Sequence, residues 1–211
     1  MARVLVTRPE GQEADLVRLL RAEGHDVVHV PLIRVEPLGD GPIDVSGYDW
    51  VVVTSANGAR ELRRRARGRM PRVAAIGAAT AEAMGGADLV AGVSTQEGLL
   101  ADMPQPAGRV LFAAAESARR VVADALDADV VPLYRTRELT IAELPPADLV
   151  VLASPSAARA YARSGGALPA ATIGPETSSA ARDAGVVVAA EAATHDLAGL
   201  ADAVRRALGE P

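Results

Sequence analysis

The strongest constraint on the fold is an internal repeat. The segment Asp49–Asn57, which reads DWVVVTSAN, returns as Asp148–Ser156, which reads DLVVLASPS. A second pair, Ala75–Thr80 and Thr172–Thr177, shares Ile-Gly near its start and a closing Thr. Solenoid units are about 20 to 50 residues long, so a repeat of this length indicates duplication of a whole domain. The chain is therefore expected to contain two similar halves.

Short apolar runs alternate with helical patterns along the chain, and five such runs fall in each half. The expected strands are Arg3–Val6, Asp26–Val30, Trp50–Thr54, Val73–Ile76, Asp88–Ala91, Arg109–Ala113, Asp129–Leu133, Leu149–Ala153, Ala171–Ile173 and Val186–Ala189. Between the first two, Leu16 and Leu20 share one helical face, and Gly24 is placed to end that helix. Continuous apolar strands separated by helices are typical of parallel sheets covered on both faces. We therefore expect an α/β fold with two similar, flavodoxin-like parallel sheets of five strands each.

The repeat leaves the domain boundaries open. Two proline-bearing stretches, Pro31–Pro37 and Pro132–Leu139, are candidates for crossings of the chain from one domain to the other. If the chain crosses at both, its middle segment forms one domain and its two ends combine into the other. If it does not, each half is a contiguous domain.

The composition excludes several kinds of chemistry. Of the 211 residues 49% are apolar but only 2% are aromatic, so Val, Leu, Ile and Ala must build the cores. There is no cysteine and no lysine. Disulfides, thiolate nucleophiles, Schiff bases and P-loop lysines are therefore excluded. All basic side chains apart from histidine are arginines, which suit bidentate recognition of carboxylates or phosphates.

Charge and hydropathy bear on partners and location. The net charge of −5 argues against a general nucleic-acid binder. No apolar run approaches the length of a membrane span. The first residues, Met1–Thr7, enter a strand directly and lack the apolar region of a signal peptide. We therefore expect a cytoplasmic protein that binds neither membrane nor nucleic acid.

Small polar residues follow the strands in both halves and open the next helices. The segments are Thr7–Glu10, Ser55–Asn57, Gly77–Thr80, Ser94–Glu97, Ser154–Ser156, Gly174–Thr177 and Thr194–Asp196. Taken singly, each is explained by helix N-capping, and Ser94 with Glu97 has the spacing of a capping box. The carboxyl ends of parallel strands share one edge, where helix N-termini also offer amides to anions. Two such edges facing each other would form a cleft suited to an elongated ligand with many carboxylates.

Other motifs are better explained by structure than by chemistry. No complete dinucleotide or P-loop glycine motif is present, so we expect no nucleotide cofactor. His25, His29 and His195 have no metal-site spacing and are expected to be surface or structural residues. The seven arginines between Arg60 and Arg72 indicate a solvated helix C-terminus. A role between domains or toward substrate carboxylates is the alternative for these arginines.

Tyr134 is the best candidate for chemistry. It ends an expected strand at one of the possible crossings, and its counterpart in the other half is Ile33. A phenol there could donate a proton to a leaving group. An amphipathic edge residue would explain the tyrosine equally well.

The order and spacing of these motifs resemble uroporphyrinogen-III synthases along nearly the whole chain. The matching segments are Thr7–Pro9, Val30–Leu32, Asp49–Asn57, Ala75–Gly77, Thr80–Ala81, Glu97–Leu100, Tyr134–Thr136, Ser154–Ser156, Ile173–Pro175 and Thr177. The resemblance implies two parallel α/β domains joined by a two-stranded linker, the first domain being discontinuous. The domains would be residues 1–33 with 138–211 and residues 37–133, and the linker strands would be 33–37 and 133–138.

The resemblance also implies an enzyme, a lyase that converts linear hydroxymethylbilane to uroporphyrinogen III. The chain of pyrroles closes with loss of water and inversion of ring D, on the route to haem, sirohaem and cobalamin. It implies no cofactor and no metal, and we expect a monomer. A non-catalytic sensor of tetrapyrroles or small anions on the same fold is the alternative, although a sensor would be expected to carry an output module.

The resemblance assigns roles to individual residues. Tyr134 matches the family tyrosine proposed to assist departure of the hydroxyl. The expected substrate-binding residues are Thr7, Arg8, Ser55, Asn57, Thr80, Ser154, Ser156 and Thr177. The chain departs from the family pattern at Asp127-Ala128, where a glycine turn is usual, and at Ser178, where alanine is common.

Overall fold

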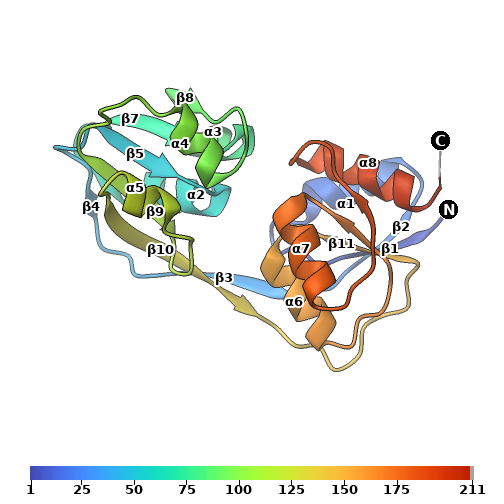
Figure 1. The fold of residues 1–211 in the computed structure, drawn as a ribbon. Coiled ribbons are helices and arrows are strands. Elements are labelled where there is room, and N and C mark those ends of the chain that lie inside the picture. Colours follow the sequence, from blue (N-terminus) through green and yellow to red (C-terminus); the bar gives the residue numbers. More distant parts are fainter. Residues whose placement is uncertain (210–211) are drawn as a thin grey trace. The chain divides into compact units, whose positions relative to one another are not determined.

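The structure is a computed structural model that describes residues 1–209. The chain divides into two compact units (Figure 1). Unit 1 consists of Met1–Arg34 and the chain from Thr136 onward, and unit 2 consists of Val35–Arg135. Both units are built on parallel strands covered by helices, which confirms the expected α/β class.

Unit 1 contains a parallel sheet of five strands in the order β13-β12-β11-β1-β2. The strands are β1 (Arg3–Val6), β2 (Asp26–His29), β11 (Leu149–Leu152), β12 (Ala170–Thr172) and β13 (Val188–Glu191). Numbered within the unit, this is the flavodoxin-like order, whose switch point lies between β1 and β11. The helices are α1 (Ala14–Ala22), α6 (Pro155–Arg163), α7 (Pro175–Asp183) and α8 (Leu197–Ala207).

Alternation along β1 explains how unit 1 buries both faces of its sheet. Val4 and Val6 pack with α1 and α8, whereas Leu5 packs with α6 and α7 on the opposite face. Leu16 and Leu20 of α1 are fully buried, as their spacing predicted. Gly24 follows the helix with a φ of +87°, a conformation that glycine adopts without strain.

Unit 2 is arranged in the same way around a sheet of six strands, in the order β3-β10-β9-β5-β7-β8. The strands are β3 (Ile33–Pro37), β5 (Trp50–Val53), β7 (Arg72–Ala75), β8 (Leu89–Val90), β9 (Val110–Ala115) and β10 (Asp129–Glu138). The helices are α2 (Ala56–Arg65), α3 (Ala78–Met84), α4 (Gln96–Asp102) and α5 (Val121–Ala125), and two short strands, β4 (Ile43–Asp44) and β6 (Ala66–Arg67), pair separately. The sixth strand of this sheet, β3, pairs with β10 at the edge and covers residues 33–37, the range expected for a linker strand. The expected strand at Asp129–Leu133 is longer, since pairing continues to Glu138.

The internal repeat corresponds to the same spatial order of strands in both sheets. Strands β5, β7 and β8 take the places of β11, β12 and β13, and β9 and β10 take those of β1 and β2. The switch point of unit 2 therefore lies between β5 and β9. Helices α2 and α3 cover one face of this sheet, and α4 and α5 cover the other.

Two departures from the family pattern have local structural explanations. Asp127 has a φ of +46°, so it occupies a left-handed turn position of the kind that glycine favours. The Ser178 hydroxyl is fully buried and lies 2.6 Å from the Thr172 hydroxyl. Serine at this position therefore has a buried polar partner that alanine could not engage.

Candidate functional site

The candidate site of unit 2 begins where β5 ends. Ser55 has extended backbone angles and caps α2, since its side chain accepts a hydrogen bond of 3.0 Å from the Gly58 amide. The four apolar residues of β5 are buried, so the strand is anchored in the core. Ser55 lies two positions after the last of them, Val53. The capped helix N-terminus lies at the carboxyl edge of the sheet, beside the switch point.

A β-bulge brings Tyr134 toward this edge. The pairing of β10 with β9 shifts register between Pro132 and Tyr134, so that Tyr134 lies opposite Ala115. In a regular strand, Leu133 and Tyr134 would point to opposite faces. Here both are buried in the same core cluster, with exposed fractions of 0% and 7%. Bulges re-aim side chains in this way and are frequent beside functional sites.

Ser55 and Tyr134 meet through their hydroxyl groups, whose oxygens are 2.8 Å apart. The backbone of Tyr134 is held as well, because its carbonyl accepts a 2.8 Å bond from the Glu116 amide. Gly58 lies beside both side chains. A Cβ atom at that position would lie 3.1 Å from the Ser55 Oγ and 3.7 Å from the tyrosine ring.

Burial determines the charge state of the tyrosine. Desolvation raises the pKa of the Tyr134 phenol, and the hydrogen bond with Ser55 lowers it by less. The phenol is therefore neutral at physiological pH and retains a proton that it can donate. Sequence reasoning singled out both residues but could not pair them, since they are 79 positions apart.

The equivalent edge of unit 1 lacks a phenol. Ser154 caps α6 by accepting a 3.2 Å bond from the Ala157 amide, and its hydroxyl lies 3.1 Å from that of Ser156. By the repeat, Ile33 is the counterpart of Tyr134, and it is a buried hydrophobic residue. Both units therefore have a capped helix at this point, and the residue that corresponds to Tyr134 carries no hydroxyl in unit 1.

Arg8 is held by its own loop in unit 1. Its Nε donates a 2.7 Å bond to the Gln12 carbonyl, and the Arg8 carbonyl lies 2.9 Å from the His29 Nε2. The half-buried guanidinium is therefore tied to the β1–α1 loop. His29 has a structural role here, as the sequence led us to expect.

Three of the expected substrate-binding residues are enclosed by protein. Thr7, Thr80 and Thr177 have exposed fractions of 0%, 4% and 2%. The Thr7 hydroxyl donates a 2.8 Å bond to the Val151 carbonyl, which links β1 to β11. All three threonines are therefore buried, whereas Ser55, Asn57, Ser154 and Ser156 are partly exposed.

The expected cap at Ser94 was displaced by one residue. Thr95 caps α4 by accepting a 3.0 Å bond from the Gly98 amide. Glu97 does not complete a capping box at Ser94 but pairs with Arg119 at 2.7 Å. The capping-box spacing was misleading because the adjacent hydroxyl of Thr95 takes the capping position.

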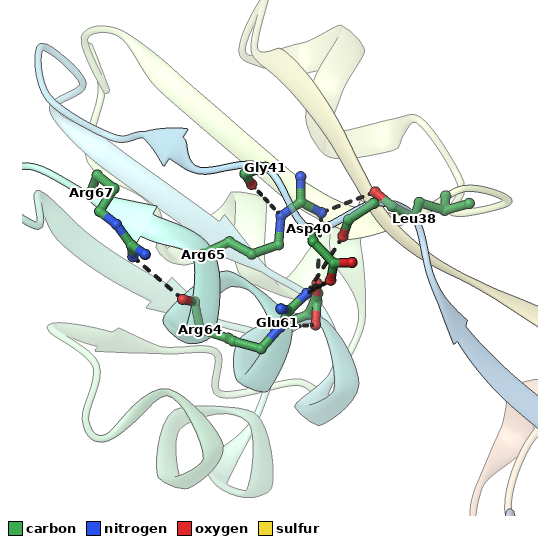
Figure 2. A network of polar contacts seen from close by, with 8 residues as sticks. Leu38, Asp40, Gly41, Glu61, Arg64, Arg65 and Arg67 are labelled. Atoms are coloured by element: carbon green, nitrogen blue, oxygen red, sulfur yellow. Dashed lines mark hydrogen bonds and ion pairs between the residues drawn. The ribbon is translucent and has the colours of Figure 1, made fainter.

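The arginine-rich segment begins inside α2, and Figure 2 shows the network that Arg64, Arg65 and Arg67 form with neighbouring residues of unit 2. Glu61, whose side chain is 10% exposed, contacts Arg64 at 2.7 Å and Arg65 at 3.7 Å. Arg64 also pairs with Asp40, and Arg65 donates to the carbonyl groups of Leu38 and Gly41.

This network attaches the chain after β3 to the end of α2. The carboxylates of Glu61 and Asp40 raise the pKa of Arg64, which keeps its charge fixed. Sequence reasoning missed Glu61, although a single acidic residue among seven arginines was a usable signal. The arginines at the end of α2 also fit the expected helix C-terminus, where cations are favoured.

Comparison with known proteins decides the family. The family described as uroporphyrinogen-III synthase HemD matches residues 14–202. The chain belongs to the uroporphyrinogen-III synthase family. The resemblance found in the sequence motifs is thereby confirmed.

Individual members of the uroporphyrinogen-III synthase family differ considerably from this chain. The uroporphyrinogen-III synthase of Synechococcus elongatus is 27% identical over 159 residues, which are 64% of this chain and 60% of that protein. The chain spans less than two thirds of the length of the curated relatives it matches. A crystal structure of a mutant uroporphyrinogen III synthase from Thermus thermophilus covers 99% of both chains, with a TM-score of 0.61 and 17% identity. At that identity the likeness concerns the fold alone.

Within residues 1–209, none of the helices has the length and apolar character that a membrane span needs. In the same residues, no three His, Asp or Glu side chains are grouped as potential metal ligands.

Proposed function

We propose that this protein is a uroporphyrinogen-III synthase, a lyase that closes hydroxymethylbilane to uroporphyrinogen III with loss of water and inversion of ring D. Membership of the family supports the proposal. The observation that carries it is the buried, neutral Tyr134 phenol, which meets the capped N-terminus of α2 at the switch point of its sheet. No feature of the described residues favours the alternative of a tetrapyrrole or anion sensor.

Tyr134 would act as a general acid. Its phenol proton passes to the terminal hydroxyl of hydroxymethylbilane as the C–O bond breaks, so water leaves, and an azafulvenium cation and the Tyr134 phenolate remain. Attack by a carbon of ring D, rearrangement and loss of a proton then give the closed product. The net change is the loss of one water molecule, and no electrons are exchanged, so the step requires no redox cofactor.

Most of the rate and all of the selectivity would come from positioning the substrate. Unassisted closure gives the uninverted isomer, so the enzyme must hold a flexible chain in the geometry that inverts ring D. The substrate carboxylates would bind at helix N-termini, where free amides and the helix dipole favour anions. We propose Asn57 in the first turn of α2, Ser154 and Ser156 at the start of α6, and Arg8 as side chains that contact these carboxylates.

The domain organisation is part of the same proposal. We propose one domain of residues 1–33 with 138–211 and one of residues 37–133, connected by strands at 33–37 and 133–138. The compact units support this, because they divide the chain between Arg34 and Val35 and between Arg135 and Thr136. The pairing of β3 with β10 supports two paired linker strands.

The test is to supply freshly made hydroxymethylbilane and identify the uroporphyrinogen isomer that forms. We expect the type III isomer from the wild-type protein. The Tyr134→Phe variant should lower turnover by about 100-fold or more, the usual range for loss of a general acid, with little change in melting temperature. Only type I product at the spontaneous rate would reject the proposed function. Unchanged turnover in the variant would reassign Tyr134 to a structural role.

A further inference from the structure

The Ser55–Tyr134 contact restricts how protons can be arranged at the site. A serine hydroxyl has one proton and two lone pairs. One lone pair of Ser55 accepts the Gly58 amide at 3.0 Å, which leaves one lone pair and the proton for the contact with Tyr134. Either the tyrosine donates to the serine or the serine donates to the tyrosine.

The two arrangements differ in what they leave for a substrate. If Tyr134 donates to Ser55, the phenol proton is engaged in a hydrogen bond within the protein and does not point toward a substrate. If Ser55 donates to Tyr134, the phenol proton is free to point away from Ser55. Only the second arrangement also stabilises the phenolate, because a donor aimed at a new negative charge strengthens as the charge develops.

We propose that Ser55 is a positioning residue for Tyr134. The Ser55 hydroxyl donates a hydrogen bond to the phenol oxygen while Tyr134 protonates the leaving hydroxyl. The inference rests on the proposed function and replaces the expectation that Ser55 holds a substrate carboxylate. In the step itself the phenol O–H bond breaks, an O–H bond of the departing water forms, and the C–O bond of the substrate breaks. The phenolate recovers a proton when the closed product releases one.

The surroundings of the pair favour a fixed contact. Ser55 is immobilised as the cap of α2, and Tyr134 is fixed by the bulge and by its carbonyl bond to the Glu116 amide. Gly58 leaves room for the cap hydroxyl, since a Cβ atom there would lie only 3.1 Å from the Ser55 Oγ, whereas its 3.7 Å distance from the Tyr134 ring would be an ordinary contact. Ser154, the equivalent cap in unit 1, faces Ser156 instead.

A double-mutant cycle with Ser55→Ala and Tyr134→Phe tests the proposal in the isomer assay. We expect Ser55→Ala alone to lower kcat by about 10- to 100-fold, as for loss of a hydrogen bond to a charged group, with KM nearly unchanged. In the Tyr134→Phe background the same change should have no further effect. In the protein that retains Tyr134, Ser55→Thr should keep most of the kcat that Ser55→Ala loses. A raised KM that persists in that background would overturn the proposal in favour of a carboxylate contact.

Titration of the tyrosine gives a second readout that needs no activity. The ionisation of Tyr134 is followed by ultraviolet absorbance as the difference between matched proteins with and without Tyr134→Phe. Ser55→Ala should raise the pKa of the Tyr134 phenol, because the donor to the phenolate is lost. Thr95→Ala removes a comparable cap from α4 and should leave that titration unchanged. An unchanged titration in Ser55→Ala would overturn the proposal.

The isomer assay tests the proposed function, and the Tyr134 titration tests the role of Ser55. If the wild-type protein yields only type I product, the proposed function fails, and the titration still reports whether Ser55 donates to Tyr134. If type III product forms but Ser55→Ala has neither effect, only the role of Ser55 fails. Melting curves of Ser55→Ala and Thr95→Ala show whether loss of a cap by itself accounts for lost turnover.

Discussion

At the scale of single residues, burial has opposite consequences for the hydroxyl groups at the sheet edges. Thr7 is enclosed and uses its hydroxyl to link two strands, so its polarity serves the fold. Tyr134 is also buried, but its hydroxyl meets a partly exposed serine at the end of β5. The buried hydroxyl of Thr7 therefore links two strands, whereas burial of Tyr134 keeps its phenol neutral.

The raised pKa of Tyr134 predicts a specific pH dependence of stability. A phenol whose folded pKa lies above the unfolded value of about 10 contributes equally at all lower pH values. Its contribution is then lost as pH rises from about 10 through the folded pKa, because the unfolded chain ionises first. Urea denaturation across this range should show wild-type stability falling more steeply than that of Tyr134→Phe. Parallel curves for the two proteins would contradict a raised pKa at Tyr134.

At the scale of elements, α2 connects the candidate site to the chain that follows β3. Its first residues are capped by Ser55, and its last turn contributes Arg64 and Arg65 to the network around Glu61 (Figure 2). Two arginines of the arginine-rich segment, Arg64 and Arg65, therefore attach residues 38–41 to the helix.

Replacing Glu61 by glutamine should destabilise unit 2. The change removes the carboxylate that faces the poorly exposed guanidinium of Arg65 and leaves that cation without its ionic partner. We expect a loss of about 1 to 3 kcal/mol in the free energy of unfolding, measured by urea denaturation. The matched control is Glu97→Gln, which breaks the solvent-exposed pair with Arg119 and should have little effect. Equal effects of the two variants would show that burial of Glu61 is unimportant.

At the scale of the whole molecule, residues 1–209 form four core clusters, and each draws all its members from a single unit. Two clusters lie on the two faces of the unit 1 sheet, and two lie on those of the unit 2 sheet. Because apolar burial is the dominant source of stability, each unit holds its own stabilising core.

We therefore expect the two units to lose structure separately. Leu62→Ala removes a fully buried side chain from unit 2 and should cost about 2 to 5 kcal/mol there. Hydrogen exchange should show faster exchange of amides within residues 35–135 and nearly unchanged exchange in unit 1. Leu16→Ala in α1 is the reciprocal variant and should produce the opposite pattern. Equal acceleration in both units would indicate one cooperative structure.

The local pattern of the sequence was sufficient to predict the α/β class and most strands. Apolar runs and glycines that end helices depend on only a few neighbouring residues. The strand Arg3–Val6 and the helix that ends before Gly24 were predicted in this way. Motif order was likewise sufficient for the family, since it survives where overall identity is low.

The tertiary structure alone decided which of the polar edge residues meet. Whether a hydroxyl is enclosed, as in Thr80, or meets a partner, as in Ser55, depends on packing by segments distant in the sequence. The orientation of Tyr134 depends on a one-residue register shift against β9. Such a shift reverses the face on which a side chain lies without altering the local apolar pattern, and so it is set by strand pairing and not by the sequence around it.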